Sequence, residues 1–410
     1  MAIGKTTLFS GKGRAGDLLD PKNWNDGVVP GVNDTEVIKM DPGGPVGGTV
    51  SVGSMMLLGP ETITFTGTLN TVGFGGCSGL MVCVGAGAVF APGATLNDGN
   101  TLIVGKGATG VLLAEGSGTT HSTINTLTAQ LGQMANGVGT VTIDDAVWNN
   151  SLAAFIGENG TGTLNVTNNG SVTFGKSVVM GQYAGSSGHM TIASGGSVVV
   201  DGLLRVGGVM AAPAGTGTVS VGSGSHLTVD QSLSVGSGST VAIAGGTITA
   251  GVVSDSITTM AGGVISGFGT LTVTDGQPIN DGGIIRATGG NLQINGNVAG
   301  KGSIQIDANS IATINSTSLK LAGIAFIGPN ATLSLAHAST VTAPISGFAI
   351  GDVIRMANVD AASFMASTGM LTLKDHGATV ESLHLLGSFA GDTFAVTQSA
   401  TDAMITLQHH

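Results

Sequence analysis

Apolar and polar residues alternate along this chain in short runs that end at glycine or at an Asn-Gly pair. A representative stretch contains three such runs, at residues 163–166 (TLNV), 171–174 (SVTF) and 178–180 (VVM). Alternation with a period of two residues predicts β-strands that bury one face. Helical periodicity is nearly absent, since the segment 152–155 (LAAF) is too short to count. The pattern therefore predicts an all-β protein built from very short strands.

A longer repeat organises these strands. Its unit is a small apolar residue, a glycine, a short polar stretch, Gly-Thr and an alternating strand. The glycine of each unit is Gly105, Gly132, Gly157, Gly181, Gly207 or Gly236, so successive units are 27, 25, 24, 26 and 29 residues apart. A period in this range is typical of stacked-repeat proteins. Three short strands and three tight turns return the chain to its starting azimuth, and the next coil then lies about 4.8 Å higher. We therefore expect a parallel β-helix (β-solenoid) of about 12 coils with terminal caps.

Composition agrees with this fold. Glycine accounts for 71 of 410 residues and charged residues for only 9%, whereas an ordinary globular domain has about 25% charged residues. A sharp corner requires positive φ or close backbone approach, and glycine allows both. The six repeat glycines are therefore predicted to be structural turn residues. Outward Thr and Ser keep the surface soluble without placing like charges in columns along the coils.

The repeat resembles a known class of sequence. Residues 155–173, FIGENGTGTLNVTNNGSVT, are similar to the short β-helix repeat of autotransporter passengers and PEP-CTERM-associated surface proteins, and a degenerate form of the repeat covers roughly residues 100–250. The segment around Trp24, with residues 29–35, resembles the entry to such passengers and is expected to form a first coil that buries Trp24. From Ile345 onward the text resembles the carboxy-terminal β-unit of large secreted bacterial adhesins. These resemblances imply secretion and display outside the cell.

The text predicts three segments: an N-terminal first coil and cap at 1–48, a β-solenoid at 49–344, and a C-terminal β cap with an export or assembly role at 345–410. An open solenoid end exposes unpaired backbone groups, which must be covered or used. We expect an extracellular structural or adhesive protein that associates with itself head to tail into a surface filament or matrix fibre. The alternative is a β-helix that binds or degrades polysaccharide, like a tailspike or pectinase.

Charge and hydropathy exclude other classes. The chain has 13 basic and 24 acidic residues, a net charge of −11, so a nucleic acid would be repelled. No apolar run reaches the roughly 18 to 20 residues that span a bilayer, so no membrane span is expected. Strong stacking on sugars is disfavoured, because the only Trp and Tyr residues are Trp24, Trp148 and Tyr183.

Motif matches add no cofactor. Residues 170–177, GSVTFGKS, satisfy the P-loop pattern, but a P-loop needs a strand before it and a helix after it, and SVTF is itself a strand of the repeat. The two GxGxxG strings at 11–16 and 105–110 also precede no expected helix. Cys77 and Cys83 are compatible with a small local disulfide or with two buried thiols. No metal centre is expected. Calcium binding through the aspartate of residues 280–282 (NDG) is an alternative that the sequence leaves open.

A catalytic centre is not expected either. Hydrolytic β-helices need two carboxyl groups within several ångströms of each other. Asp144 and Asp145 are neighbours in sequence and would point to opposite faces of a strand. A cross-coil pair of Glu158 with either aspartate is left open. The remaining glutamates are Glu36, Glu61, Glu115 and Glu381.

Overall fold

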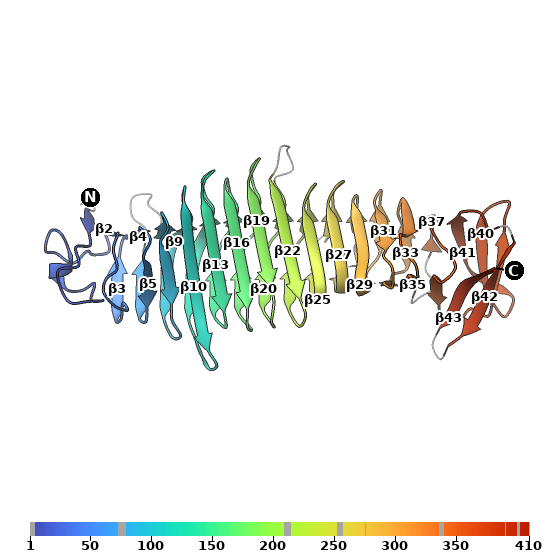
Figure 1. Cartoon of the computed structure of the whole chain (residues 1–410), viewed down its shortest axis with the longest axis horizontal. Coiled ribbons are helices and arrows are strands. Elements are labelled where there is room, and N and C mark those ends of the chain that lie inside the picture. The colour runs from blue at the N-terminus through green and yellow to red at the C-terminus, as the bar shows by residue number, and fades with distance from the viewer. Residues whose placement is uncertain are drawn as a thin grey trace. The chain divides into compact units, whose positions relative to one another are not determined.

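The structure, a computed structural model of the whole chain, describes residues 5–72, 79–208, 215–251, 257–274, 276–335, 340–389, 391–399 and 402–409. Parallel coils of short strands stack into a β-solenoid of about 12 turns, which confirms the fold class (Figure 1). The chain forms two compact units, Met1–Leu227 (unit 1) and Thr228–His410 (unit 2). In the part of the chain that is described, no helix is long and apolar enough to cross a membrane.

Unit 1 has three parallel ladders, one for each face of the coil. Face 1 contains β5 (Thr62–Phe65), β8 (Gly87–Phe90), β10 (Thr109–Ser117), β13 (Val138–Asp144), β16 (Thr161–Thr167), β19 (Ser187–Ile192) and β22 (Thr216–Gly222). Face 2 contains β3 (Thr49–Val52), β6 (Thr68–Thr71), the first parts of β9 (Thr95–Val104) and β12 (Thr123–Leu131), β14 (Val147–Asn150), β17 (Ser171–Phe174) and β20 (Ser197–Val200). Face 3 contains β1 (Thr6–Leu8), β2 (Thr35–Ile38), β4 (Ser54–Leu58), β7 (Leu80–Cys83), the second parts of β9 and β12, β15 (Ala154–Ile156), β18 (Val178–Met180) and β21 (Leu204–Val206).

Unit 2 continues with the same kind of coil, and β23 (His226–Val229) spans the boundary between the units. Its long strands bend from one ladder into the next; they are β25 (Thr240–Ala250), β27 (Val264–Val273) and β29 (Ile284–Asn295). Short strands extend these two ladders as β31 (Ser303–Ile306), β34 (Gly323–Phe326) and β37 (Ile345–Ser346), and as β32 (Ile311–Asn315), β35 (Thr332–Leu335) and β38 (Val353–Met356). The third ladder contains β24 (Leu233–Val235), β26 (Ile257–Thr259), β28 (Ile279–Asp281), β30 (Val298–Gly300), β33 (Ser318–Lys320) and β36 (Thr340–Val341).

Antiparallel strand pairs follow the parallel ladders of unit 2, although β37 itself pairs in parallel with β41. β43 (Ala403–His409) pairs antiparallel with both β38 and β42 (Asp392–Gln398). A second antiparallel sheet contains β39 (Ala361–Met365), β40 (Met370–Asp375) and β41 (Ala378–Leu386). Phe348, Phe364, Phe389 and Phe394 pack against one another here, with ring centroids 5.1 to 6.2 Å apart. The last parallel coil of unit 2 is therefore covered by strands of opposite direction and by an aromatic cluster.

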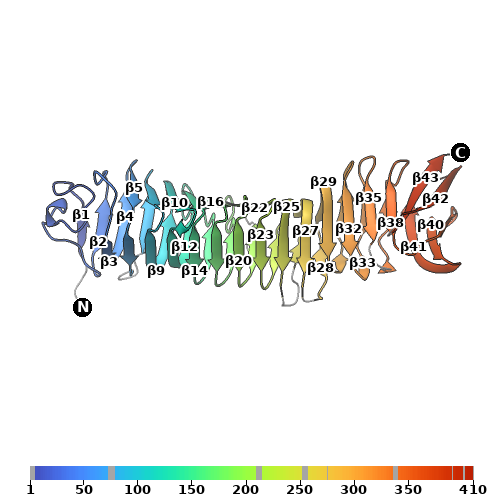
Figure 2. The same ribbon diagram turned by 90° about the horizontal axis from the view of Figure 1, so that it is seen from below.

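Register within unit 1 follows the repeat. Leu164 of β16 stacks between Val141 of β13 and Met190 of β19, and all three side chains are buried. Outward positions stack in the same way, because the side-chain period of a strand is two. Strands of successive coils lie side by side in Figure 2. Aromatic rings join the inner columns, as in the stacked pair Phe65 and Phe90, whose centroids are 4.9 Å apart.

Candidate functional site

The repeat glycines from Gly105 to Gly207 form the corner between faces 3 and 1 of unit 1, and Gly236 lies in unit 2. Five of the six predicted turn glycines have positive φ: Gly105 (78°), Gly132 (65°), Gly157 (75°), Gly181 (60°) and Gly207 (89°). Gly236 also lies in a turn, since its carbonyl accepts a hydrogen bond from Ser239 N–H at 3.1 Å. The positive φ of that turn, however, belongs to Gly238 (70°). A third position of a tight turn often requires left-handed backbone, which glycine adopts without steric cost.

A second glycine column was missed by the sequence analysis. Gly110, Gly139, Gly162, Gly188 and Gly217 occupy one inward position of β10, β13, β16, β19 and β22 and pair with each other in register. A Cβ atom at Gly139 would lie 2.6 Å from the backbone nitrogen of Gly132. The strand thus passes directly against the corner of its own coil. The sequence does contain a signal for this column, since Gly-Thr or Gly-Val recurs a few residues after most corner glycines. The sequence analysis treated that pair only as the start of the strand.

Uncharged polar side chains stack along the outside of unit 1. On face 2 the side-chain amides of Asn70, Asn97, Asn125 and Asn149 form a ladder, in which each Nδ2 donates to the Oδ1 of the preceding coil at 2.9 to 3.0 Å. The first member, Asn70, donates to Ser51 Oγ at 3.0 Å. On face 1, outward hydroxyl and amide groups stack in register, and His189 interrupts one column between Thr163 and Thr218. The stacked groups are Thr140, Thr142, Thr161, Thr163, Asn165, Ser187, Thr191, Thr216, Thr218 and Ser220.

The corner between faces 1 and 2 contains a group of ionisable side chains, Glu115, His121, Asp144 and Asp145. Here β10 continues past its neighbours into a hairpin with β11 (Thr120–His121) (Figure 1). His121 Nδ1 lies 3.3 Å from the Asp145 carboxylate, which also accepts the Gly118 N–H at 3.1 Å. Asp144 accepts from Asn168 Nδ2 at 2.6 Å. Asp144 pairs directly with Glu115 of β10, so two carboxylates face each other on neighbouring coils.

The cross-coil pairs left open for Glu158 are wrong. Glu158 precedes β16, whereas Asp144 stands opposite Thr167 at the far end of that strand. Six strand residues separate the two ends, a distance of about 20 Å. Burial raises the pKa of Glu158, and its Oε2 has no hydrogen-bond partner in the described part of the chain. The carboxylate partner of Asp144 is therefore Glu115, which the sequence analysis did not connect with it.

The calcium site considered at 280–282 does not fit the geometry. Asp281 faces the interior and is fully buried, and its Oδ1 accepts the Gly283 N–H at 3.0 Å. The carboxylate therefore closes its own turn from inside. Asp98 and Asp352 do the same at other corners. In each of these three side chains burial raises the pKa.

Another group of potential metal ligands lies among the antiparallel strands of unit 2. The ligand atoms of Asp360, Asp375 and His376 lie within 4.8 Å of one another. His376 N–H donates to Asp360 Oδ2 at 2.8 Å, and His376 Nδ1 lies 2.6 Å from Asp375 Oδ1. These groups therefore bind one another at the β40–β41 turn and fix its shape.

The other motif residues take structural positions. Residues 171–174 of the P-loop-like string are β17, and exposed Lys176 lies in the turn before β18. Gly110 of the second GxGxxG string lies within β10, while the string at 11–16 precedes only a 3-10 turn, η1 (Pro21–Asn23). Cys83 is a free and buried thiol, and burial raises its pKa although Lys106 opposes this. Cys77 lies outside the described residues.

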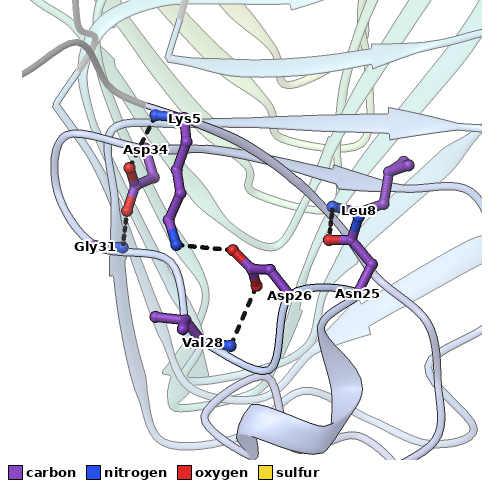
Figure 3. A network of polar contacts seen from close by, with 7 residues as sticks. All are labelled: Lys5, Leu8, Asn25, Asp26, Val28, Gly31 and Asp34. Atoms are coloured by element: carbon purple, nitrogen blue, oxygen red, sulfur yellow. Dashed lines mark hydrogen bonds and ion pairs between the residues drawn. The ribbon is translucent and has the colours of Figure 1, made fainter.

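The N-terminal segment of unit 1 closes the first coil. Trp24 is only 3% exposed, as predicted, and its Nε1 donates to Leu18 O at 2.9 Å. Leu8 of β1 exchanges two hydrogen bonds with Asn25, one from Leu8 N–H to Asn25 Oδ1 at 3.1 Å and one from Asn25 N–H to Leu8 O at 3.0 Å. Lys5 Nζ binds Asp26 Oδ2 at 2.7 Å (Figure 3). The loop after β1 therefore supplies hydrogen-bond partners for the backbone N–H and C=O of Leu8.

The fold defines the class of protein as a parallel β-solenoid with stacked outward ladders. Comparison with protein family models, with curated proteins and with solved structures finds nothing that matches the chain.

Proposed function

We propose that this chain is an extracellular structural or adhesive β-solenoid that makes its contacts through repetitive outer surfaces. One observation carries the proposal. Successive coils of unit 1 place uncharged hydroxyl and amide groups in register, both on face 1 and in the amide ladder of face 2. Such a surface offers many equal hydrogen-bonding positions at the coil spacing of about 4.8 Å. It suits a repetitive partner, either further copies of this chain or a surface polysaccharide.

Self-association is the first partner to test. Heterologous contacts that do not close produce fibres. In unit 1 the backbone edge of Leu8 is occupied by Asn25, so head-to-tail stacking through this end requires the N-terminal segment to move. Lateral contact through face 1 requires no such movement.

The test introduces charge at two outward positions of one column that lie two coils apart, Thr142→Glu with Thr191→Glu. The matched control places the same charges on face 3, outside both polar surfaces, at Gln130 of β12 and Val179 of β18, which also lie two coils apart in one column. Negative-stain images and co-sedimentation with insoluble polysaccharides should show assemblies or binding for the wild type and for the control, with loss in the face 1 variant. A wild type that remains dispersed and binds none of the polysaccharides would sink the proposal.

A polysaccharide hydrolase is the second candidate, favoured by the pairing of Glu115 with Asp144. Paired strands lie about 4.8 Å apart, and retaining glycosidases hold their two carboxyl groups about 5 Å apart. Release of reducing ends from a polysaccharide panel tests this candidate, with Glu115→Gln as the inactive variant. Equal release by wild type and variant would exclude Glu115 from the chemistry.

A further inference from the structure

The first coil of unit 1 contains an unusual buried acid. We call residues Lys5–Ile38, which comprise β1, the loop after it and β2, the N-terminal lid. Glu36 of β2 is 0% exposed, and neither carboxyl oxygen has a hydrogen-bond partner among the residues that the structure describes. By register it lies between Thr7 of β1 and Met55 of β4, both also fully buried. A charged carboxylate in such surroundings is strongly disfavoured.

No described charged group compensates Glu36. Thr7 faces it from β1 and Met55 faces it from β4, and neither carries charge. The Lys5–Asp26 pair lies at the partly exposed outside of the lid. Burial alone raises the pKa of Glu36, to about 8. The folded lid therefore holds a proton that the unfolded segment releases at much lower pH, and its stability falls as pH rises toward 8.

The strand beneath the lid is apolar on both sides. β4 has the sequence Ser-Met-Met-Leu-Leu, and its inward residues Met55 and Leu57 are buried in the core. Its outward residues Met56 and Leu58 pack against a hydrophobic cluster of Met81, Cys83 and Ile103. In the closed lid, β2 pairs with one edge of β4. Without β2, that edge would present unpaired backbone groups flanked by apolar side chains, which is a template for another strand.

We propose that the N-terminal lid is a pH-sensitive cover that opens under alkaline conditions and exposes the edge of β4 to a second copy of this chain. The occupant is a second copy, because opening the lid in that copy exposes the same edge of β4, whereas the last parallel strands of unit 2, β37 and β38, stay paired with β41 and β43. Two identical edges can pair about a two-fold axis. The inference rests on the self-association part of the proposed function and specifies when it occurs. The polar contacts within the lid, which join its loop to β1 and to the start of the segment, are drawn in Figure 3.

The experiment uses the full chain between pH 6 and pH 9. Hydrogen exchange of β2 amides is measured relative to β16 amides in the same molecule, which removes the intrinsic pH effect on exchange. The ratio should rise on the order of 100-fold over this range. Glu36→Gln and Glu36→Met cannot ionise, and their ratios should stay flat. Glu61→Gln, at an exposed position, is the matched control and should retain the full response.

Sedimentation velocity at the same pH values measures association separately. Dimers or larger species that form at pH 9 with the wild type and Glu61→Gln, and not with Glu36→Met, support the inference. A β2 to β16 ratio that does not change with pH overturns the lid and leaves the proposed function standing. A lid that opens while the chain stays monomeric overturns both the docking of a second copy and head-to-tail association.

Discussion

Three glycines of unit 1 allow the cost of left-handed backbone and the cost of a Cβ collision to be measured separately. Gly185 has φ of +80°, and a Cβ atom there would meet nothing within 4 Å. Gly139 has ordinary φ, but a Cβ atom would lie 2.6 Å from Gly132 N and would also meet Val104 O. Gly157 combines both conditions, with φ of +75° and the backbone of Ser187 in the path of a Cβ atom. Alanine at these three positions tests strain, collision and both together.

The three substitutions should lower the free energy of unfolding by different amounts. Gly185→Ala introduces only left-handed strain, which costs about 1 kcal/mol. Gly139→Ala forces two backbone segments apart, and because neither is the mobile end of a side chain, the coil itself must shift. Overpacking of this kind costs at least about 3 kcal/mol. Gly157→Ala should cost at least as much as Gly139→Ala, since strain is added to the collision.

Urea unfolding followed by far-UV circular dichroism and tryptophan fluorescence measures all three variants. The order of destabilisation should be Gly185→Ala, then Gly139→Ala, then Gly157→Ala. If Gly139→Ala unfolds within about 0.5 kcal/mol of the wild type, the close approach of strand and corner is not a constraint and the account of the second glycine column fails.

Three other measurements test a buried carboxyl group, a buried hydroxyl group and the exposed amide ladder. Because burial raises the pKa of Asp98, the folded state holds its proton to higher pH than the unfolded chain, and the melting temperature should fall as pH rises above about 4; calorimetry that finds a rise would contradict this. Thr126→Val removes the acceptor of Trp148 Nε1 and the donor to Asn150 Oδ1, so urea unfolding should show a loss of about 1 to 3 kcal/mol. Asn97→Ala interrupts an exposed amide ladder and should cost less than about 1 kcal/mol in the same assay; a larger loss would mean that the ladder is a main source of stability.

The architecture was predictable because its signal is local and repeated. Between Gly105 and Gly207 each coil repeats its corner glycine, and the alternation after it fixes which side chains face inward. Burial of Trp24 was also predicted. The sequence did not indicate which glycine of a turn takes the positive φ; at residues 236–239 it is Gly238.

Side-chain pairs between coils were far less predictable. Glu115 and Asp144 meet because β10 and β13 pair without a shift, but the β10–β11 hairpin lengthens that coil, so spacing alone does not reveal the register. Glu36 was unremarkable in sequence, because a glutamate among alternating residues is normally outward. Its burial follows from the register of β2 between β1 and β4, which depends on the loop that closes the first coil.

Some of the few charged residues in the chain are inward aspartates that join successive coils. Asp98 accepts two backbone N–H groups, from Leu80 in the preceding coil and from Asn100 in its own turn, both at 2.9 Å. Asp352 accepts from Ala331 and Ala349 in the same way, both at 3.0 Å. A carboxylate has two oxygens that can serve two donors at once, which a hydroxyl does less well. A glycine stands next to the aspartate in both corners, Gly99 after Asp98 and Gly351 before Asp352. The buried acids therefore join successive coils at corners that also contain glycine. Because burial raises the pKa of these acids, the same residues that close the corners also make the stability of the stack depend on pH.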